Sequence, residues 1–200
     1  MAERPDFKDL VGSLKKAASA LREAGVPFML GGGLASAARG GPETEHDVDL
    51  FLKPEDADRA LAALEEAGFR PEKPPEGWLY KAWDGDIFVD LIFETSAGPV
   101  EDEHFERSDE FEVYAVPMRV QSPEDLLVAK LLALDEMSLN MKAPLQIARA
   151  LREQIDWADV YARTEGSPYA KAFLSLLEEL EIVSKEALSA TGGSDPGGQT

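Results

Sequence analysis

The sequence predicts an α+β fold with a mixed sheet: a sheet domain over residues 1–120, a helical segment over 121–189 and a disordered tail over 190–200. In the first part, short apolar runs typical of strands alternate with stretches whose apolar residues recur at helical spacing. After Ser122-Pro123, a pair typical of a helix start, only helical spacing continues. The tail ATGGSDPGGQT is glycine-rich and polar, which is typical of disorder.

The sheet domain is expected to follow the order helix, strand, glycine turn, helix, strand, helix, hairpin, strand. Helices are expected at 9–24, 34–39 and 54–67, strands at 26–30, 47–52, 78–83, 86–93 and 112–119, and loops at 71–77 and 101–110. Asp84-Gly85, between two apolar runs, predicts the hairpin turn. In the helical segment, helices are expected at 124–136, 145–163 and 168–188.

The charge is strongly acidic, with 20 Lys and Arg against 39 Asp and Glu in 200 residues, a net −19. Binding to nucleic acid rests largely on neutralising phosphates, so this charge counts against a nucleic-acid partner. It suits a cationic small molecule, a basic protein partner or solubility alone. The absence of cysteine excludes thiol chemistry and disulfides. Without a signal peptide or an apolar stretch that could cross a bilayer, a cytoplasmic location and no membrane partner are expected.

Three carboxylates and a glycine run form the candidate site. Asp47 and Asp49 stand two residues apart in a predicted strand, so both project from the same face. Asp90 lies in the run FVDLIF, where a carboxylate is costly unless it is paired or binds metal. Each could be a solvated strand residue taken alone. Together they predict a site for two magnesium ions about 4 Å apart.

The glycines Gly31-Gly32-Gly33 lie between a predicted strand and a predicted helix. Glycines let backbone N–H groups approach a phosphate, and a helix N-terminus favours anions. Such a run by itself is more often a plain tight turn. Its position before the aspartate pair is what makes phosphate binding the expectation here.

The segment Met29 to Leu52, MLGGGLASAARGGPETEHDVDLFL, resembles the signature of the nucleotidyltransferase superfamily with the DNA polymerase β-like fold. That signature is a glycine pair, a spacer and Asp-x-Asp among apolar residues, with a third carboxylate on a later strand. The matching residues are Gly32, Gly33, Asp47, Asp49 and Asp90. Residues 122–134, SPEDLLVAKLLAL, resemble the helix that follows the sheet in bacterial members. These members include small antibiotic nucleotidyltransferases and toxin-type transferases of toxin–antitoxin systems.

The resemblance implies an enzyme that moves a nucleoside monophosphate from a triphosphate such as ATP to a hydroxyl acceptor, releasing pyrophosphate with the help of two Mg²⁺ ions. It implies that Asp47, Asp49 and Asp90 bind the metal and carry catalysis, with Asp90 also activating the acceptor hydroxyl. The nucleotide-binding residues that it implies are Gly32, Gly33, Ser36, Arg39 and Lys130. A solvated or structural role is the alternative for Arg39 and Lys130.

Three classes of function stay open: an enzyme acting on a small molecule, an enzyme acting on a protein or tRNA, and a catalytically inactive nucleotide- or partner-binding module of a toxin–antitoxin type system. His46 either contacts substrate or only begins a strand, and His104 is expected at the surface. The acidic stretch 101–110 is a solvated loop or a contact for a cationic acceptor. Three aromatic residues are expected either to line an acceptor pocket or to pack the hairpin: Trp78, Tyr80 and Trp83.

Overall fold

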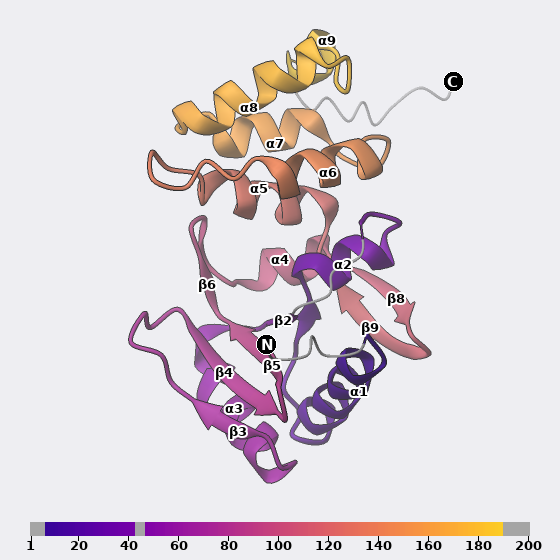
Figure 1. The fold of residues 1–200 in the computed structure, drawn as a ribbon, viewed down its shortest axis with the longest axis vertical. Helices are drawn as coiled ribbons and strands as arrows, with labels where there is room; N and C mark the ends of the chain where they lie inside the picture. Colours follow the sequence, from indigo (N-terminus) through magenta and orange to yellow (C-terminus); the bar gives the residue numbers. More distant parts are fainter. Residues whose placement is uncertain (1–6, 43–46, 190–200) are drawn as a thin grey trace, which may run out of the picture.

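A computed structural model describes residues 7–42 and 47–189. The predicted α+β fold is confirmed: a mixed sheet with its own covering helices lies below a stack of C-terminal helices (Figure 1). Within the described residues, every helix is too short or too polar to cross a membrane. The expectations for His46 and for the tail at 190–200 lie outside the described residues.

The bounds of the elements follow the chain in three groups. The helices of the sheet domain are α1 Phe7–Glu23, α2 Gly32–Ala38, α3 Ala57–Glu66 with a 3₁₀ turn Pro54–Asp56 before it, and α4 Asp102–Arg107. The strands are β1 Met29–Leu30, β2 Val48–Phe51, β3 Arg70–Glu72, β4 Leu79–Asp84, β5 Ile87–Ile92, β6 Glu94–Thr95, β7 Gly98–Pro99, β8 Asp109–Val113 and β9 Val116–Val120. The C-terminal helices are α5 Pro123–Leu132, α6 Lys142–Leu151, α7 Trp157–Thr164, α8 Pro168–Glu179 and α9 Lys185–Ser189.

The main sheet has the strand order β3-β4-β5-β2-β1-β9-β8, and β6 and β7 form a separate ribbon. β2 is parallel to β5 and β1 is parallel to β9, whereas the other neighbours are antiparallel. The two edge strands are therefore β3, which contains Pro71, and β8, which carries Asp109, Glu110 and Glu112. The parallel pair at the centre sets Asp49 directly opposite Asp90.

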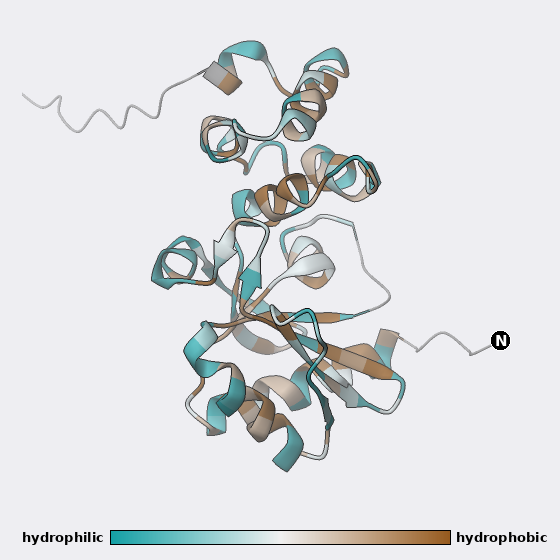
Figure 2. Ribbon diagram, turned by 90° about the vertical axis from the view of Figure 1, so that its left-hand side faces the viewer, coloured by the Kyte–Doolittle hydropathy of each residue, from teal (hydrophilic) through white to brown (hydrophobic). Residues whose placement is uncertain are grey.

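The sheet buries one face against α1 and α3. Side chains alternate along each strand, so Val89 and Leu91 of β5 join Leu14 of α1 and Leu64 of α3 in the main core. The intervening residue, Asp90, belongs to the opposite face. Figure 2 shows the resulting pattern, with apolar residues along the central strands and hydrophilic residues on the outer helix surfaces. The chemistry-bearing face is thus the one that these two helices leave open.

The C-terminal helices form a second apolar cluster of their own. Phe173 and Leu127 are fully buried in it, together with Val160 and Leu151 from the neighbouring helices. In Figure 1 these helices stack above the sheet domain, with α5 nearest to α2. α5 begins at an N-cap, Ser122, whose Oγ accepts a hydrogen bond from the Asp125 N–H.

The prediction of a single strand at 112–119 is wrong. These residues belong to a hairpin, with β8 and β9 paired up to Val113 opposite Val116. The turn residues Tyr114 and Ala115 have φ of +50° and +66°. A turn of this kind is usually marked by Asn or Gly, which this chain lacks here, so the sequence pattern hides the turn.

The hairpin between β4 and β5 is confirmed, but its turn is shifted by one residue. Asp84 pairs with Ile87 inside the sheet, so the turn residues are Gly85 and Asp86, with Gly85 at φ +64°. Positive φ at the first turn position alone is typical of a type II′ turn. Asp84 is held on the strand because Ser13 and Lys16 of α1 both bond its carboxylate, at 2.8 and 2.7 Å.

The acidic loop expected at 101–110 contains a short helix, α4. Its N-terminus carries a capping box in which the Glu101 carboxylate accepts from the His104 N–H and His104 Nδ1 accepts from the Glu101 N–H at 3.1 Å. His104 is half-buried, so its expected surface position is also wrong. Histidine at the third helical position is not the usual Glu or Gln, which explains why the sequence conceals this cap.

The two long helices expected at 145–163 and 168–188 each divide in two. The first ends at Leu151, and Asp156 then caps α7 by accepting from the N–H groups of Ala158 and Asp159. The second ends at Glu179, and Glu181 turns the chain with φ +55° before α9 begins. Helical spacing of apolar residues continues across both breaks, because each pair of shorter helices packs on the same apolar cluster.

Candidate active site

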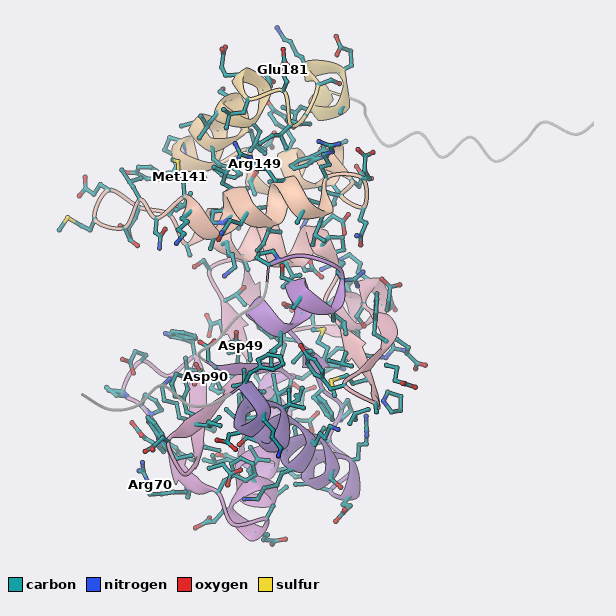
Figure 3. All side chains as sticks on the ribbon, turned by 45° about the vertical axis from the view of Figure 1, so that its right-hand side comes forward. Asp49, Arg70, Asp90, Met141, Arg149 and Glu181 are labelled. Carbon is teal, nitrogen blue, oxygen red and sulfur yellow. The ribbon has the colours of Figure 1, made fainter. Side chains whose placement is uncertain are left out.

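Three carboxylates meet on the face of the sheet opposite α1 and α3. Asp49 of β2 and Asp90 of β5 are direct neighbours, and Asp47 immediately precedes β2. One carboxylate oxygen from each of the three lies within 4.8 Å of the others. Figure 3 shows Asp49 and Asp90 close together in the sheet domain, below the C-terminal helices. The alternation seen in the sequence thus brings together the three aspartates that it singled out.

The glycine turn makes the space that Asp49 occupies. The N–H of Gly31 donates to the Asp49 carbonyl oxygen at 2.9 Å, which holds the turn beside β2. Gly32 has φ +57°, and a Cβ at this position would stand 1.7 Å from Asp49 Oδ2. Both the backbone conformation and the contact therefore require glycine. Gly33 follows in the first turn of α2, so of the two predicted phosphate-binding glycines Gly32 is the one in contact with a carboxylate.

The carboxylates repel one another electrostatically. Burial, followed by the charges of Asp47 and Asp90, raises the pKa of Asp49 from 3.8 to about 7 against the lowering effect of Lys130 and Lys81. Burial also raises the pKa of Asp90, although Lys81 opposes this shift. Crowded carboxylates with raised pKa values are typical of sites that bind a cation or exchange a proton.

The donor set suits a divalent metal. Three carboxylate oxygens are hard ligands, which Mg²⁺ prefers, and Gly32 has no Cβ that would displace the Asp49 carboxylate. A cation placed among Asp47, Asp49 and Asp90 would offset the repulsion that helps to raise the pKa values of Asp49 and Asp90. The residues present therefore fit a metal by their donor chemistry and by the repulsion that a cation would offset.

Lys130 of α5 lies near the carboxylates. It is half-buried, and its charge is one of those that lower the pKa of Asp49. Within the described ranges, Lys130 has no hydrogen-bonded or ionic partner of its own. A lysine at this position could reach a phosphate group bound at the carboxylates, so the nucleotide contact of Lys130 stays a prediction.

Arg39 is engaged elsewhere in the protein. Its side chain is buried, Nε donates to the Gln121 carbonyl oxygen at 2.6 Å, and Nη2 donates to Asp109 Oδ2 at 2.8 Å. The guanidinium also lies over the Phe111 ring, 4.9 Å from its centroid. These contacts tie α2 to the β8–β9 hairpin, which supports the structural role for Arg39 over the expected nucleotide contact.

Ser36 is buried in α2 rather than open to a ligand. Its Oγ has no hydrogen-bond partner within the described part of the chain. The backbone of Gly41 closes over it, since a Cβ there would stand 2.2 Å from Ser36 Oγ. The expected nucleotide contact of Ser36 thus has no geometric support beyond its place in the helix after the glycines.

The three aromatic residues considered for an acceptor pocket do not converge. Tyr80 packs edge-on against Phe93 at the main core, with ring centroids 5.0 Å apart. Trp83 lies on the opposite face, 5.2 Å from the Phe88 ring. Trp78 is 42% exposed at the entry to β4. Tyr80 and Trp83 therefore pack the hairpin, which was the alternative interpretation.

One charged neighbour of the site was missed by the sequence analysis. Lys81 of β4 stands opposite Asp90 in the sheet, and its Nζ lies 2.7 Å from Asp90 Oδ1. The signal that could have found it is the cross-strand register of the β4–β5 hairpin, because directly opposite residues share a face.

The chain matches, over residues 9–182, the model of a family described as "Uncharacterised nucleotidyltransferase". The protein belongs to this nucleotidyltransferase family. The nucleotidyltransferase is thus an enzyme that transfers a nucleoside monophosphate, as the resemblance in its glycine and aspartate motifs implied. A comparison with functionally curated proteins gives no match.

Solved structures share the fold of this nucleotidyltransferase. ANT(2'')-Ia in complex with adenylyl-2''-tobramycin has 20% identity and a TM-score of 0.59, over 83% of this chain and 97% of that chain. The lincosamide antibiotic adenylyltransferase LnuA, bound to lincomycin, has 15% identity and a TM-score of 0.51, over 76% and 100%. At such identities the likeness establishes the polymerase β-like fold and leaves the acceptor to be argued separately.

Proposed function

We propose that the protein is a Mg²⁺-dependent nucleotidyltransferase that uses a nucleoside triphosphate such as ATP to modify a hydroxyl group of a small molecule. The observation that carries this proposal is the cluster of Asp47, Asp49 and Asp90 beside the turn at Gly32. This arrangement supplies metal ligands and a route for a phosphate chain in the same place.

Each group at the site has a role set by its position. Asp47, Asp49 and Asp90 would hold two Mg²⁺ ions, which supply charge stabilisation for the triphosphate and the attacking oxygen. The N–H groups of the Gly32-Gly33 turn orient the phosphate chain. Lys130 adds a positive charge from α5 and so neutralises part of the triphosphate.

The reaction exchanges one P–O bond for another. The acceptor hydroxyl oxygen attacks the α-phosphorus, the bond from that phosphorus to the bridging oxygen breaks, and pyrophosphate leaves. The hydroxyl proton passes to the carboxylate of Asp90, the residue that the family resemblance implies for activating the acceptor. Charge balance is preserved because the leaving oxygen retains the electron pair of the broken bond.

The proposed acceptor is a small molecule with cationic groups. Two observations support this choice: the net charge of −19, which suits a cationic compound, and the fold shared with ANT(2'')-Ia and LnuA, whose structures hold adenylyl-2''-tobramycin and lincomycin. The same charge opposes tRNA as the acceptor.

The test incubates the purified protein with each α-labelled nucleoside triphosphate, Mg²⁺ and cell extract that is then separated into small-molecule, protein and RNA fractions. We expect label in the small-molecule fraction, and a loss of at least about 100-fold in Asp47→Asn and Asp90→Asn. Asp86→Asn, a change in the exposed β4–β5 turn, is the matched control and should label normally. Label in the protein or RNA fraction would show that the acceptor is a protein or an RNA and not a small molecule. No labelling, but Mg²⁺-dependent nucleotide binding, would leave the alternative function, an inactive nucleotide-binding module. If labelling and Mg²⁺-dependent nucleotide binding were both absent, the proposed function would be refuted.

A further inference from the structure

A single row of charged residues crosses four strands and ends at the metal ligands. Glu72 of β3 stands opposite Lys81 of β4, Lys81 stands opposite Asp90 of β5, and Asp90 stands opposite Asp49 of β2. Opposite residues on neighbouring strands share a face, with Cβ atoms about 5 Å apart. Lys81 is the one cation in this row, directly beside the crowded carboxylates.

The contacts of Lys81 are directed to Asp90. Asp90 is 8% exposed, and a carboxylate so buried requires a partner. Lys81 Nζ provides it at 2.7 Å from Oδ1. Glu72, the opposite neighbour of Lys81, instead accepts a hydrogen bond from Trp83 Nε1 at 2.7 Å. Within residues 7–42 and 47–189, Asp90 is the one ionic partner of Lys81.

Lys81 also has a second contact that needs no carboxylate. Its Nζ lies 4.4 Å from the centroid of the Phe88 ring, which projects from β5 on the same face as Asp90. A cation over an aromatic face is stabilised electrostatically. The side chain of Lys81 is 26% exposed, so its ammonium group can also reach water. Lys81 can therefore release Asp90 without losing all favourable contacts.

We propose that Lys81 is the counter-cation of the metal-free site, a positioning residue that holds Asp90 until a divalent ion takes the carboxylate oxygen. This inference rests on the proposed function, because it assumes that Asp47, Asp49 and Asp90 bind metal. An ammonium group and a divalent cation that share one carboxylate repel each other at short range, so they compete for Asp90. Lys81 then sets the metal affinity, and when the ion binds it gives up Asp90 and keeps its contact with the Phe88 ring.

The test measures the binding of Mn²⁺ alone to the full chain by titration calorimetry, without nucleotide. Lys81→Met should lower the Kd for Mn²⁺ by about tenfold, since the competing charge is removed while a side chain of similar length remains. Lys81→Arg keeps the charge and should stay within about twofold of wild type. Lys73→Met is the matched control, because Lys73 pairs with the exposed Asp58 and should not change the Kd.

The outcomes separate this inference from the proposed function. If wild type binds Mn²⁺, Asp49→Asn abolishes that binding and Lys81→Met leaves the Kd unchanged or raises it, the role of Lys81 is overturned and the metal site stands. If wild type does not bind Mn²⁺, or Asp49→Asn has no effect, the metal site fails and the role of Lys81 fails with it. Should Lys81→Met not fold, Lys81→Gln carries the same expectation.

Discussion

Asp49 Oδ2 lies 1.7 Å from the position that a Cβ on Gly32 would occupy. Gly32→Ala must therefore displace the Asp49 carboxylate, and it must also hold alanine at φ +57°. We expect a loss of about 2 kcal/mol or more in the free energy of unfolding and a loss of Mn²⁺ binding. Urea unfolding and calorimetry measure the two effects.

Gly12→Ala is the control for this change. Gly12 lies in the middle of α1, and nothing stands within 4 Å of the place that an alanine Cβ would take, so alanine should raise stability by about 0.5–1 kcal/mol. Equal stability of Gly32→Ala and wild type would show that the cradle around Asp49 relaxes freely.

The raised pKa of Asp49 predicts a pH dependence of stability. Burial, with the charges of Asp47 and Asp90, holds this pKa at about 7 in the folded protein against 3.8 as the ordinary value. Between these pH values the folded protein keeps a proton that the unfolded chain has released, so stability falls as the pH rises through this window. In EDTA, Asp49→Asn should remove this part of the fall. The urea midpoint of the variant should therefore rise relative to that of wild type as the pH rises from about 4 to about 8. An unchanged difference across the window would contradict the raised pKa.

Asp125 is the buried anion that joins α4, α5 and α7. Its carboxylate, 2% exposed, accepts from Arg107 at 3.0 Å and from Arg163. Asp125→Asn should cost about 3 kcal/mol of unfolding free energy, the low end for breaking a buried pair, because both arginines still reach water. Asp159→Asn removes only the more exposed partner of Arg163 and should cost less than about 1 kcal/mol.

The same residue predicts behaviour in acid. Burial alone would raise the pKa of Asp125, but the hydrogen bonds from Arg107 and Arg163 hold it below 3.8. The stabilisation from this carboxylate is therefore complete above that pH and is lost as the pH falls through the lowered folded-state pKa. Wild type and Asp125→Asn should converge in stability at the acid end of a thermal unfolding series. A constant difference down to that end would contradict this account.

The turn of the β8–β9 hairpin stores strain at a residue with a Cβ. Ala115 has φ +66°, a conformation that costs about 1 kcal/mol for a residue other than glycine. Ala115→Gly should therefore raise the free energy of unfolding by about that amount in urea. Gly85→Ala, at φ +64° in the β4–β5 turn, is the reverse experiment and should lower it. The same sign of change for both variants would refute this explanation.

The sequence predicts those parts of the site that depend on neighbouring residues in the chain. Alternation along a strand places Asp47 and Asp49 on one face. The apolar neighbours of Asp90 indicate that its carboxylate needs a charged partner or a metal. Contacts between segments that are distant in the sequence could not be predicted from it. Arg39 looked available for phosphate, but its partner Gln121 lies between β9 and α5, far along the sequence.

Lys81 was missed because of the turn position. A turn at Asp84-Gly85 would have set Lys81 opposite Phe88, whereas the observed turn sets it opposite Asp90. In a hairpin the turn fixes every pair in the register, so a shift of one residue in the turn changes each cross-strand partner. The helical bounds were misjudged for a similar reason, since Asp156 caps a helix inside a run of continuous apolar spacing.

The residues on the two sheet edges bear on how the protein behaves at high concentration. An unprotected edge strand offers its N–H and C=O groups to any other edge and so promotes self-association. At β3, Pro71 withholds an N–H, and at β8 the carboxylates Asp109, Glu110 and Glu112 would face those of a second copy. Part of the strong acidity of the chain is therefore placed where it hinders intermolecular sheet extension, the first step toward aggregation.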